Sequence, residues 1–292
     1  MNQKKKKFVP IFSMIICIMI LSFFLAGCSN QDEGAKLKDK THEQIHYVDS
    51  KVAQMLNSLN NITLTGYKIS VQNMEGDSQE TSKQGDSQTK GQSTGQTTDG
   101  EEGQTENIVK YKSIPDTILS QDRSPKWDNL KKDIEILEQS WSSMVLDLAK
   151  VGITNEDIIG FSNQLNVVIT NLNAENKIDS LTNLAKLYGY LPKYLDLVLE
   201  QKEEVHLLEA KAAIFNAYAK IETDNWDQMT SDLAQAEASY MKMLEEKGQN
   251  TNQYNTDKGY ILLKEFQNAV NMKNKDVLYM KYKNVIQELN LL

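Results

Sequence analysis

Trp127-Asp128-Asn129-Leu130 returns in altered form as Trp226-Asp227-Gln228-Met229, 99 positions later. The likeness continues through five more pairs at the same spacing: Asp133/Asp232, Ile134/Leu233, Glu138/Glu237, Ser140/Ser239 and Trp141/Tyr240. Half of that spacing marks a recurring turn, because Asn176-Lys177, Asn225-Trp226 and Asn274-Lys275 lie 49 positions apart. Each turn opens a segment rich in Leu, Ala, Tyr and Ile. A period near 49 residues with two helices per unit predicts an array of helical hairpins.

The remaining segments after residue 124 also have helical patterns, so the predicted fold class is all-α. Ser124-Pro125 is typical of an N-cap followed by proline at the first helical position. Gly152 is expected to end that helix, and Thr154 to cap the next. The expected helices span about 124–151, 154–172, 178–200, 202–222, 224–246, 257–271 and 275–291, with a kink or break at Pro192.

Small and aromatic residues in this array resemble those of tetratricopeptide repeats, which stack helix pairs through such side chains. Tyr218, Trp226, Ala234 and Tyr240 carry the resemblance. The period is longer than in that family, and no unit has the full consensus. An ordinary antiparallel helix bundle remains the alternative. In either case, the aromatic side chains are expected to pack between hairpins, with lining of a binding groove as the other interpretation.

A further helix is expected before the array, from about Leu37 to Leu59. Ile45, Val48, Val52, Met55 and Leu59 form its apolar stripe. Residues 73–107 contain almost nothing apolar, so they are predicted to be a disordered insertion. The short segments Ile62–Val71 and Ile108–Ile114 on either side of it could pair as a two-stranded ribbon.

The N-terminus has the order of a secretory signal, with four lysines at 4–7 followed by an apolar run from Phe8 to Leu25. Leu25-Ala26-Gly27-Cys28 resembles the lipobox of bacterial lipoproteins. That resemblance implies cleavage between Gly27 and Cys28 and a diacylglyceryl lipid on the Cys28 thiol. An uncleaved transmembrane helix is the alternative, since the run approaches the roughly 20 residues of a span.

These boundaries divide the chain into a signal peptide (1–27), a polar tether (28–40), an N-terminal helix with a short extended segment (41–72), the insertion (73–107) and the hairpin domain (108–292). The mature part has 28 basic and 40 acidic residues, a formal net charge of −12. This charge disfavours nucleic acid and anionic lipid or wall polymers as primary partners. Cys28 is the single cysteine left after cleavage, which excludes disulfides and thiol catalysis.

His42-Glu43-Gln44-Ile45-His46 fits the H-E-x-x-H pattern, which on a helix presents two histidines to zinc and a glutamate as general base. Charged residues precede the motif, and no downstream motif supplies an evident third ligand. His42 and His46 lie off the apolar stripe, so we expect both to face water. We therefore predict no metal site, and keep His42, Glu43 and His46 as candidate ligands.

His206 is the third histidine of the chain and the last candidate metal ligand. Glu43/His46 and Glu203/His206 share the E-x-x-H spacing of di-iron carboxylate bundles. His206 lies beside the expected inward face of its helix, where we predict a boundary residue with a satisfied hydrogen bond. No phosphate-binding glycine loop, nucleophile elbow or supported catalytic triad is present in the sequence.

The sequence thus favours a non-enzymatic lipoprotein on the extracytoplasmic face of the cell membrane. The lipid on Cys28 would hold it there, with no other cofactor, and the helical domain would bind or scaffold another envelope protein. The alternative is a metal-binding protein or metal-dependent hydrolase that uses His42, Glu43 and His46. A solute receptor for a transporter is a third class, disfavoured because such receptors are usually two-lobed α/β proteins.

Overall fold

The computed structural model describes residues 9–64, 118–120, 122–248 and 253–292, with side chains from Glu33 onward except that of Gln253. The chain divides into a larger unit, residues 1–64 with 116–292, and a smaller one, residues 65–115. The predicted insertion 73–107, the segment Ile108–Ile114 and most of Ile62–Val71 lie outside the described residues. The signal segment and Cys28 lie where no side chains are described.

All secondary structure in the described residues is helical, which confirms the predicted all-α fold class. The helices are α1 (Val9–Ser58), α2 (Trp127–Lys150), α3 (Asn155–Asn173), α4 (Lys177–Tyr188), α5 (Leu191–Val198), α6 (Glu203–Ala219), α7 (Trp226–Lys247), α8 (Gln253–Val270) and α9 (Lys275–Leu289). Within the part of the chain that the structure describes, no helix has the length and apolar character needed to cross a membrane.

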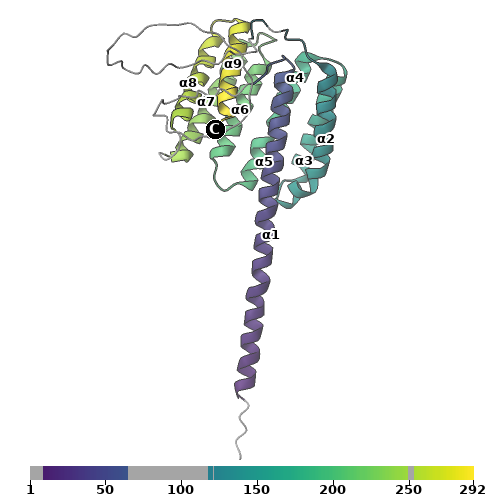
Figure 1. Cartoon of the computed structure of the whole chain (residues 1–292), viewed down its shortest axis with the longest axis vertical. Helices are drawn as coiled ribbons and strands as arrows, with labels where there is room; N and C mark the ends of the chain where they lie inside the picture. Colours follow the sequence, from purple (N-terminus) through teal and green to yellow (C-terminus); the bar gives the residue numbers. More distant parts are fainter. Residues whose placement is uncertain (1–8, 65–117, 121, 249–252) are drawn as a thin grey trace, which may run out of the picture. The chain divides into compact units, whose positions relative to one another are not determined.

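The repeat in the sequence is a repeat in the structure. Helices α2, α4, α7 and α9 begin at residues 127, 177, 226 and 275, almost one period apart. Consecutive helices pack on one another from α2 to α4 and from α6 to α9 (Figure 1). Equivalent positions of α2 and α7 are buried alike: Leu130 and Met229 at 1% and 0% exposure, and Trp141 and Tyr240 at 4% and 0%. The hairpin pattern predicted from the 99-residue spacing is therefore present.

The three recurring turns share one backbone design. Asn176, Asn225 and Asn274 are the N-caps of α4, α7 and α9, and each side chain accepts a hydrogen bond from a backbone N–H in the first turn. The residue before each cap has a positive φ, of 55° at Glu175 and Asp224 and 51° at Lys273. A left-handed residue reverses the chain, and the asparagine then satisfies one of the free N–H groups of the new helix.

Some predicted boundaries differ from the observed ones. The N-cap of α2 is Lys126 rather than Ser124, because backbone N–H and Oγ of Ser124 both bond the Asp122 carboxylate, at 3.0 and 2.7 Å. By contrast, the break expected near Pro192 is confirmed, because the segment from 178 to 200 forms two helices that are separated at Gly189 and Tyr190. Pro192 explains the break, since its ring would clash with the carbonyl of Tyr188 in a continuous helix.

The first helix also starts earlier than expected, because α1 begins at Val9 and runs through the segment predicted as a tether. Its buried residues begin at Thr41. From there α1 packs against α2, α4 and α5 (Figure 1). The predicted apolar stripe is confirmed, with Ile45, Val48, Val52, Met55 and Leu59 all at 2% exposure or less.

Helix α6 is the central element of this unit, in contact with α4, α5, α7 and α9. Eleven of its residues are buried, and they lie on every side of the helix. Four are alanines between residues 210 and 217, which let neighbouring helices approach. A helix that is apolar all round is typical of the interior of a fold rather than of its surface.

The aromatic residues pack in the core, as expected. The fully buried ones are Tyr188, Tyr194, Tyr218, Tyr240, Tyr279, Tyr282, Phe161, Phe215 and Phe266. The hydroxyls of the buried tyrosines other than Tyr279 donate hydrogen bonds to polar partners. Tyr282 donates to Oδ1 of Asn57 at 2.7 Å, and Tyr240 donates to the carbonyl of Thr256 at 2.8 Å. These tyrosines join α1 and α8 to the hairpins.

Candidate functional site

Helices α1 and α6 run in the same direction and are joined by contacts with a constant offset. His42 faces Glu204, Asp49 faces Lys211, and the carbonyl of Leu56 accepts from the hydroxyl of Tyr218 at 3.1 Å. Each pair is separated by 162 positions, and successive pairs by seven residues. Seven residues are close to two helical turns, so one face of each helix meets the other repeatedly. We call these three contacts the α1–α6 ladder.

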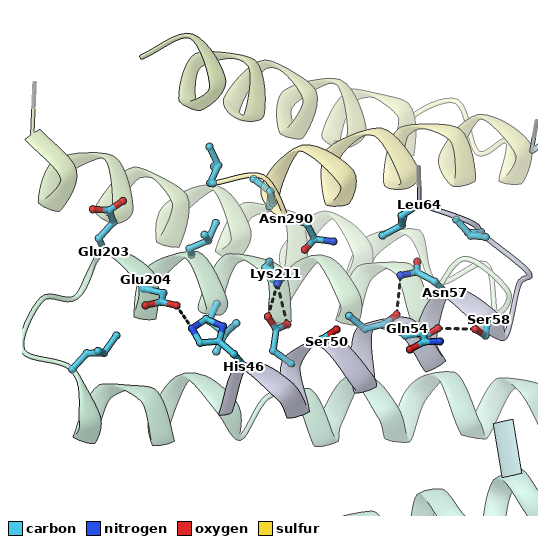
Figure 2. Close-up of a pocket in the computed structure, with 18 of the residues that line it drawn as sticks. His46, Ser50, Gln54, Asn57, Ser58, Leu64, Glu203, Glu204, Lys211 and Asn290 are labelled. Carbon is cyan, nitrogen blue, oxygen red and sulfur yellow. Dashed lines mark hydrogen bonds and ion pairs between the residues drawn. The ribbon is translucent and has the colours of Figure 1, made fainter. Parts of the chain in front are cut away.

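A groove of about 950 Å³ lies alongside the ladder. It is lined by α1 from His46 to Ser58, by the first turns of α6, and by the end of α9 with the residues after it (Figure 2). Most of the lining side chains are polar, and none of them is Phe, Tyr or Trp. The interpretation in which the aromatic side chains of the repeats line a binding groove is therefore wrong for this groove.

The middle contact of the ladder is a buried ion pair at the floor of the groove. Nζ of Lys211 lies 2.9 Å from both carboxylate oxygens of Asp49 (Figure 2). The hydroxyl of Tyr188 donates to Oδ1 of Asp49 at 2.6 Å. Burial, followed by the Asp49 charge, raises the pKa of Tyr188, so the hydroxyl keeps its proton and remains a donor. The Asp49 carboxylate is thus satisfied by three hydrogen bonds from α4 and α6.

The first contact of the ladder gathers two histidines and one carboxylate. Nε2 of His42 lies 2.9 Å from Oε2 of Glu204 and 2.9 Å from Nε2 of His46. Nε2 of His46 contacts the other oxygen, Oε1 of Glu204 (Figure 2). We call these three residues the His–His–Glu cluster. It is the one group of three potential metal ligands within 4.8 Å of one another in the described residues.

The cluster is half-buried, and its hydrogen bonds shift the pKa values of His46 and Glu204 in opposite directions. The side chains of His42, His46 and Glu204 are 30%, 41% and 33% exposed. The hydrogen bond to Glu204 raises the pKa of His46 against the opposing effect of burial. The bond to His46 correspondingly lowers the pKa of Glu204. The site therefore holds a carboxylate that is negative at neutral pH beside two imidazoles that water can reach.

The prediction that His42 and His46 face water is confirmed only in part, because their side chains are 30% and 41% exposed but also contact Glu204 of α6. Their helical positions lie off the stripe toward α2, α4 and α5, but α1 has a second contact face toward α6. Glu43, the glutamate of the motif, is exposed. Glu204 completes the cluster and was missed as a ligand. Its distance of 158 residues from His46 leaves no local spacing that could identify it.

The other candidate ligands, His206 and Glu203, lie outside the His–His–Glu cluster. Nδ1 of His206 lies 3.0 Å from Oε2 of Glu209, which confirms the predicted boundary histidine with a hydrogen bond. Glu203 pairs with Lys247 of α7 at 2.9 Å. Glu43, Glu203 and His206 therefore do not join His46 in one site, as the ligands of a di-iron centre would.

No family model, no curated protein and no solved structure matches the chain. Its function has to be inferred from its own residues.

Proposed function

We propose that this protein is a lipoprotein of the cell membrane, anchored on the extracytoplasmic face through a diacylglyceryl group on Cys28. Its helical domain binds a segment of another envelope protein in the groove beside the α1–α6 ladder. The function is binding and does not involve catalysis. The groove is the observation that supports this proposal most directly, because binding sites in proteins are typically concave and this one has a volume of about 950 Å³.

The size and chemistry of the groove suit a peptide segment that offers both apolar and polar groups, because its lining has side chains of both kinds. About 950 Å³ is at the upper end of the range for small-molecule sites, about 300–1,000 Å³, and suits a few residues of polypeptide. Exposed Ser50 and Gln54 on one wall and Asn290 at the other offer hydrogen bonds to a peptide backbone (Figure 2). The net charge of −12 argues against nucleic acid in this position.

Site-specific photo-crosslinking in intact cells tests the binding site. A photoreactive amino acid at Gln54, inside the groove, should form one discrete adduct with a membrane or envelope protein. The matched control is the same amino acid at Leu146, which is 72% exposed on α2 and away from the groove. Adducts at both positions, or at neither, would contradict binding in the groove.

The anchor is tested separately. Cys28→Ala should move the protein out of the membrane fraction while its circular dichroism spectrum stays helical. Two acyl chains hold a protein on a bilayer where a single chain gives only marginal binding, so their loss should be evident on fractionation. A Cys28→Ala protein that stays in the membrane fraction would contradict the lipoprotein assignment without affecting the groove.

A further inference from the structure

The His–His–Glu cluster has three close polar contacts, and the protons of its histidines cannot form a hydrogen bond in all of them. Each Nε2 carries either one proton or one lone pair, so each can take part in one linear hydrogen bond. The structure gives each Nε2 two close partners, because His42, His46 and Glu204 all approach one another. Linear hydrogen bonds can satisfy at most two of the three contacts. A cation held between the two Nε2 atoms and the Glu204 carboxylate would make a favourable contact with all three side chains at once.

From this convergence we propose that His42, His46 and Glu204 form a binding site for a divalent transition-metal ion of the zinc type. Imidazole nitrogen with carboxylate oxygen is a ligand set that suits Zn²⁺, whereas Mg²⁺ and Ca²⁺ prefer oxygen alone. Two histidines and one glutamate are also the protein ligands of one type of open zinc site. This proposal stands on the cluster alone and does not depend on the anchor or on a partner.

The dimensions of the cluster fit such an ion. Zinc bonds of about 2.1 Å in tetrahedral geometry place ligand atoms about 3.4 Å apart. The separations of 2.9 Å from Nε2 of His42 to its two partners are about half an ångström shorter than this, and the contact from Nε2 of His46 to Oε1 of Glu204 is shorter still. Because the three side chains are about one-third exposed, small rotamer adjustments can open the cluster to that spacing.

The backbone positions support the same geometry. His42 and His46 are one turn apart on α1, so both imidazoles leave the helix on one side. Glu204 is in the first turn of α6, on the rigid central helix. Rigid helices hold ligands more accurately than loops do.

Three protein ligands leave the fourth tetrahedral position open. His46 and Glu204 also line the groove, so a metal ion between them would lie at its end. The open position would therefore hold water, or a carboxylate or imidazole from whatever occupies the groove.

Metal titration of the full-length protein tests the proposal. The chain is produced without a polyhistidine tag, solubilised in detergent, stripped with chelator and titrated with ZnSO₄ and, separately, with MgCl₂. We expect one Zn²⁺ per chain, retained through gel filtration, and no retained Mg²⁺. His46→Gln and Glu204→Gln should each lose more than about 100-fold in Zn²⁺ affinity, since loss of even an outer partner of a ligand costs about 10–100-fold.

Two matched variants serve as controls. His206→Gln removes the other histidine of the described helices, and Glu203→Gln removes the neighbouring carboxylate of α6, so both should bind Zn²⁺ as the unmodified protein does. Circular dichroism establishes that every variant is folded, and His42→Gln replaces any that is not. Failure of the unmodified protein to retain one equivalent of Zn²⁺, or equal affinity in His46→Gln, would overturn the proposal.

Discussion

Two charged contacts of the α1–α6 ladder are seven residues, or about two helical turns, apart, yet their environments differ. The Asp49–Lys211 pair is buried, with side-chain exposures of 13% and 7%, and all of its close contacts are compatible hydrogen bonds. The His42–His46–Glu204 cluster is about one-third exposed, and its contacts exceed its protons. A buried contact in which every polar group is hydrogen-bonded is typical of a structural role. A solvent-accessible cluster with lone pairs that have no hydrogen-bond donor is typical of a ligand-binding site.

The same two helices therefore have one position that holds them together and one that is available to a ligand. Removing a partner from the first should cost stability, and removing a partner from the second should cost binding. Lys211→Met and Glu204→Gln test this division directly, and Glu222→Gln, in an ion pair outside the ladder, gives an intermediate reference; they follow in order of decreasing effect on stability.

The largest effect is expected for Lys211→Met. This change leaves the Asp49 carboxylate buried with Tyr188 as its remaining partner. Breaking a buried ion pair by removing one partner typically costs about 3–5 kcal/mol, because an uncompensated charge stays inside. Urea unfolding followed by circular dichroism measures the free energy of unfolding.

A second substitution separates charge from packing at this position. Asn at 49 together with Met at 211 removes both charges and still accepts the hydrogen bond from Tyr188, so Asp49→Asn/Lys211→Met should recover most of the loss. A double variant as unstable as Lys211→Met would show that the stem of Lys211, rather than its charge, is what matters.

An intermediate effect is expected at Glu222, in the turn between α6 and α7. Its carboxylate lies 2.7 Å from Nζ of Lys177, with side-chain exposures of 23% and 25%. Burial would raise the pKa of Glu222, but the bond from Lys177 lowers it below the ordinary value. We expect Glu222→Gln to cost about 1–2 kcal/mol at pH 7, in the lower part of the range for hydrogen bonds to charged groups.

The same contact predicts a pH dependence with a definite sign. A carboxylate whose folded-state pKa is lowered binds its proton more readily when unfolded, so its stabilisation is complete above the unfolded pKa of about 4.3. It is lost as the pH falls below that value. The stability difference between the unmodified protein and Glu222→Gln should therefore shrink between pH 5 and pH 3, to the extent of about 1–2 kcal/mol. A constant difference would exclude the carboxylate charge as its cause.

The smallest effect on stability is expected for Glu204→Gln in metal-free protein. Solvent screens a cluster that is one-third exposed, and such ion pairs contribute about 0–1 kcal/mol. Thermal unfolding with chelator present should place this variant close to the unmodified protein. A loss comparable to that of Lys211→Met would remove the distinction between the two contacts and make the cluster structural.

Features that depend on neighbouring residues were predictable from the sequence. The caps Asn176, Asn225 and Asn274 use one side chain and the adjacent turn, so their spacing was enough to locate three helix starts. The prediction at Ser124 was wrong because Asp122, two residues earlier, competes for its donors.

Features that depend on distant residues were not predictable. The H-E-x-x-H pattern identified His42 and His46, but an apolar stripe reports only the face of a helix that enters the core. The second face of α1 meets α6 through polar side chains, which leave no hydrophobic periodicity. Only the packing of α1 against the array brings Glu204 to the histidines.

The burial of helix α6 predicts how slowly its backbone amides exchange with solvent. Its backbone N–H groups are covered on every side by α4, α5, α7 and α9 and by the contacts from α1. No local fraying exposes the middle of such a helix, so its amide hydrogens should exchange with solvent deuterium only when the whole domain unfolds. Residues 208–217 should thus be the slowest to exchange, and their rate should report the global stability that Lys211→Met reduces.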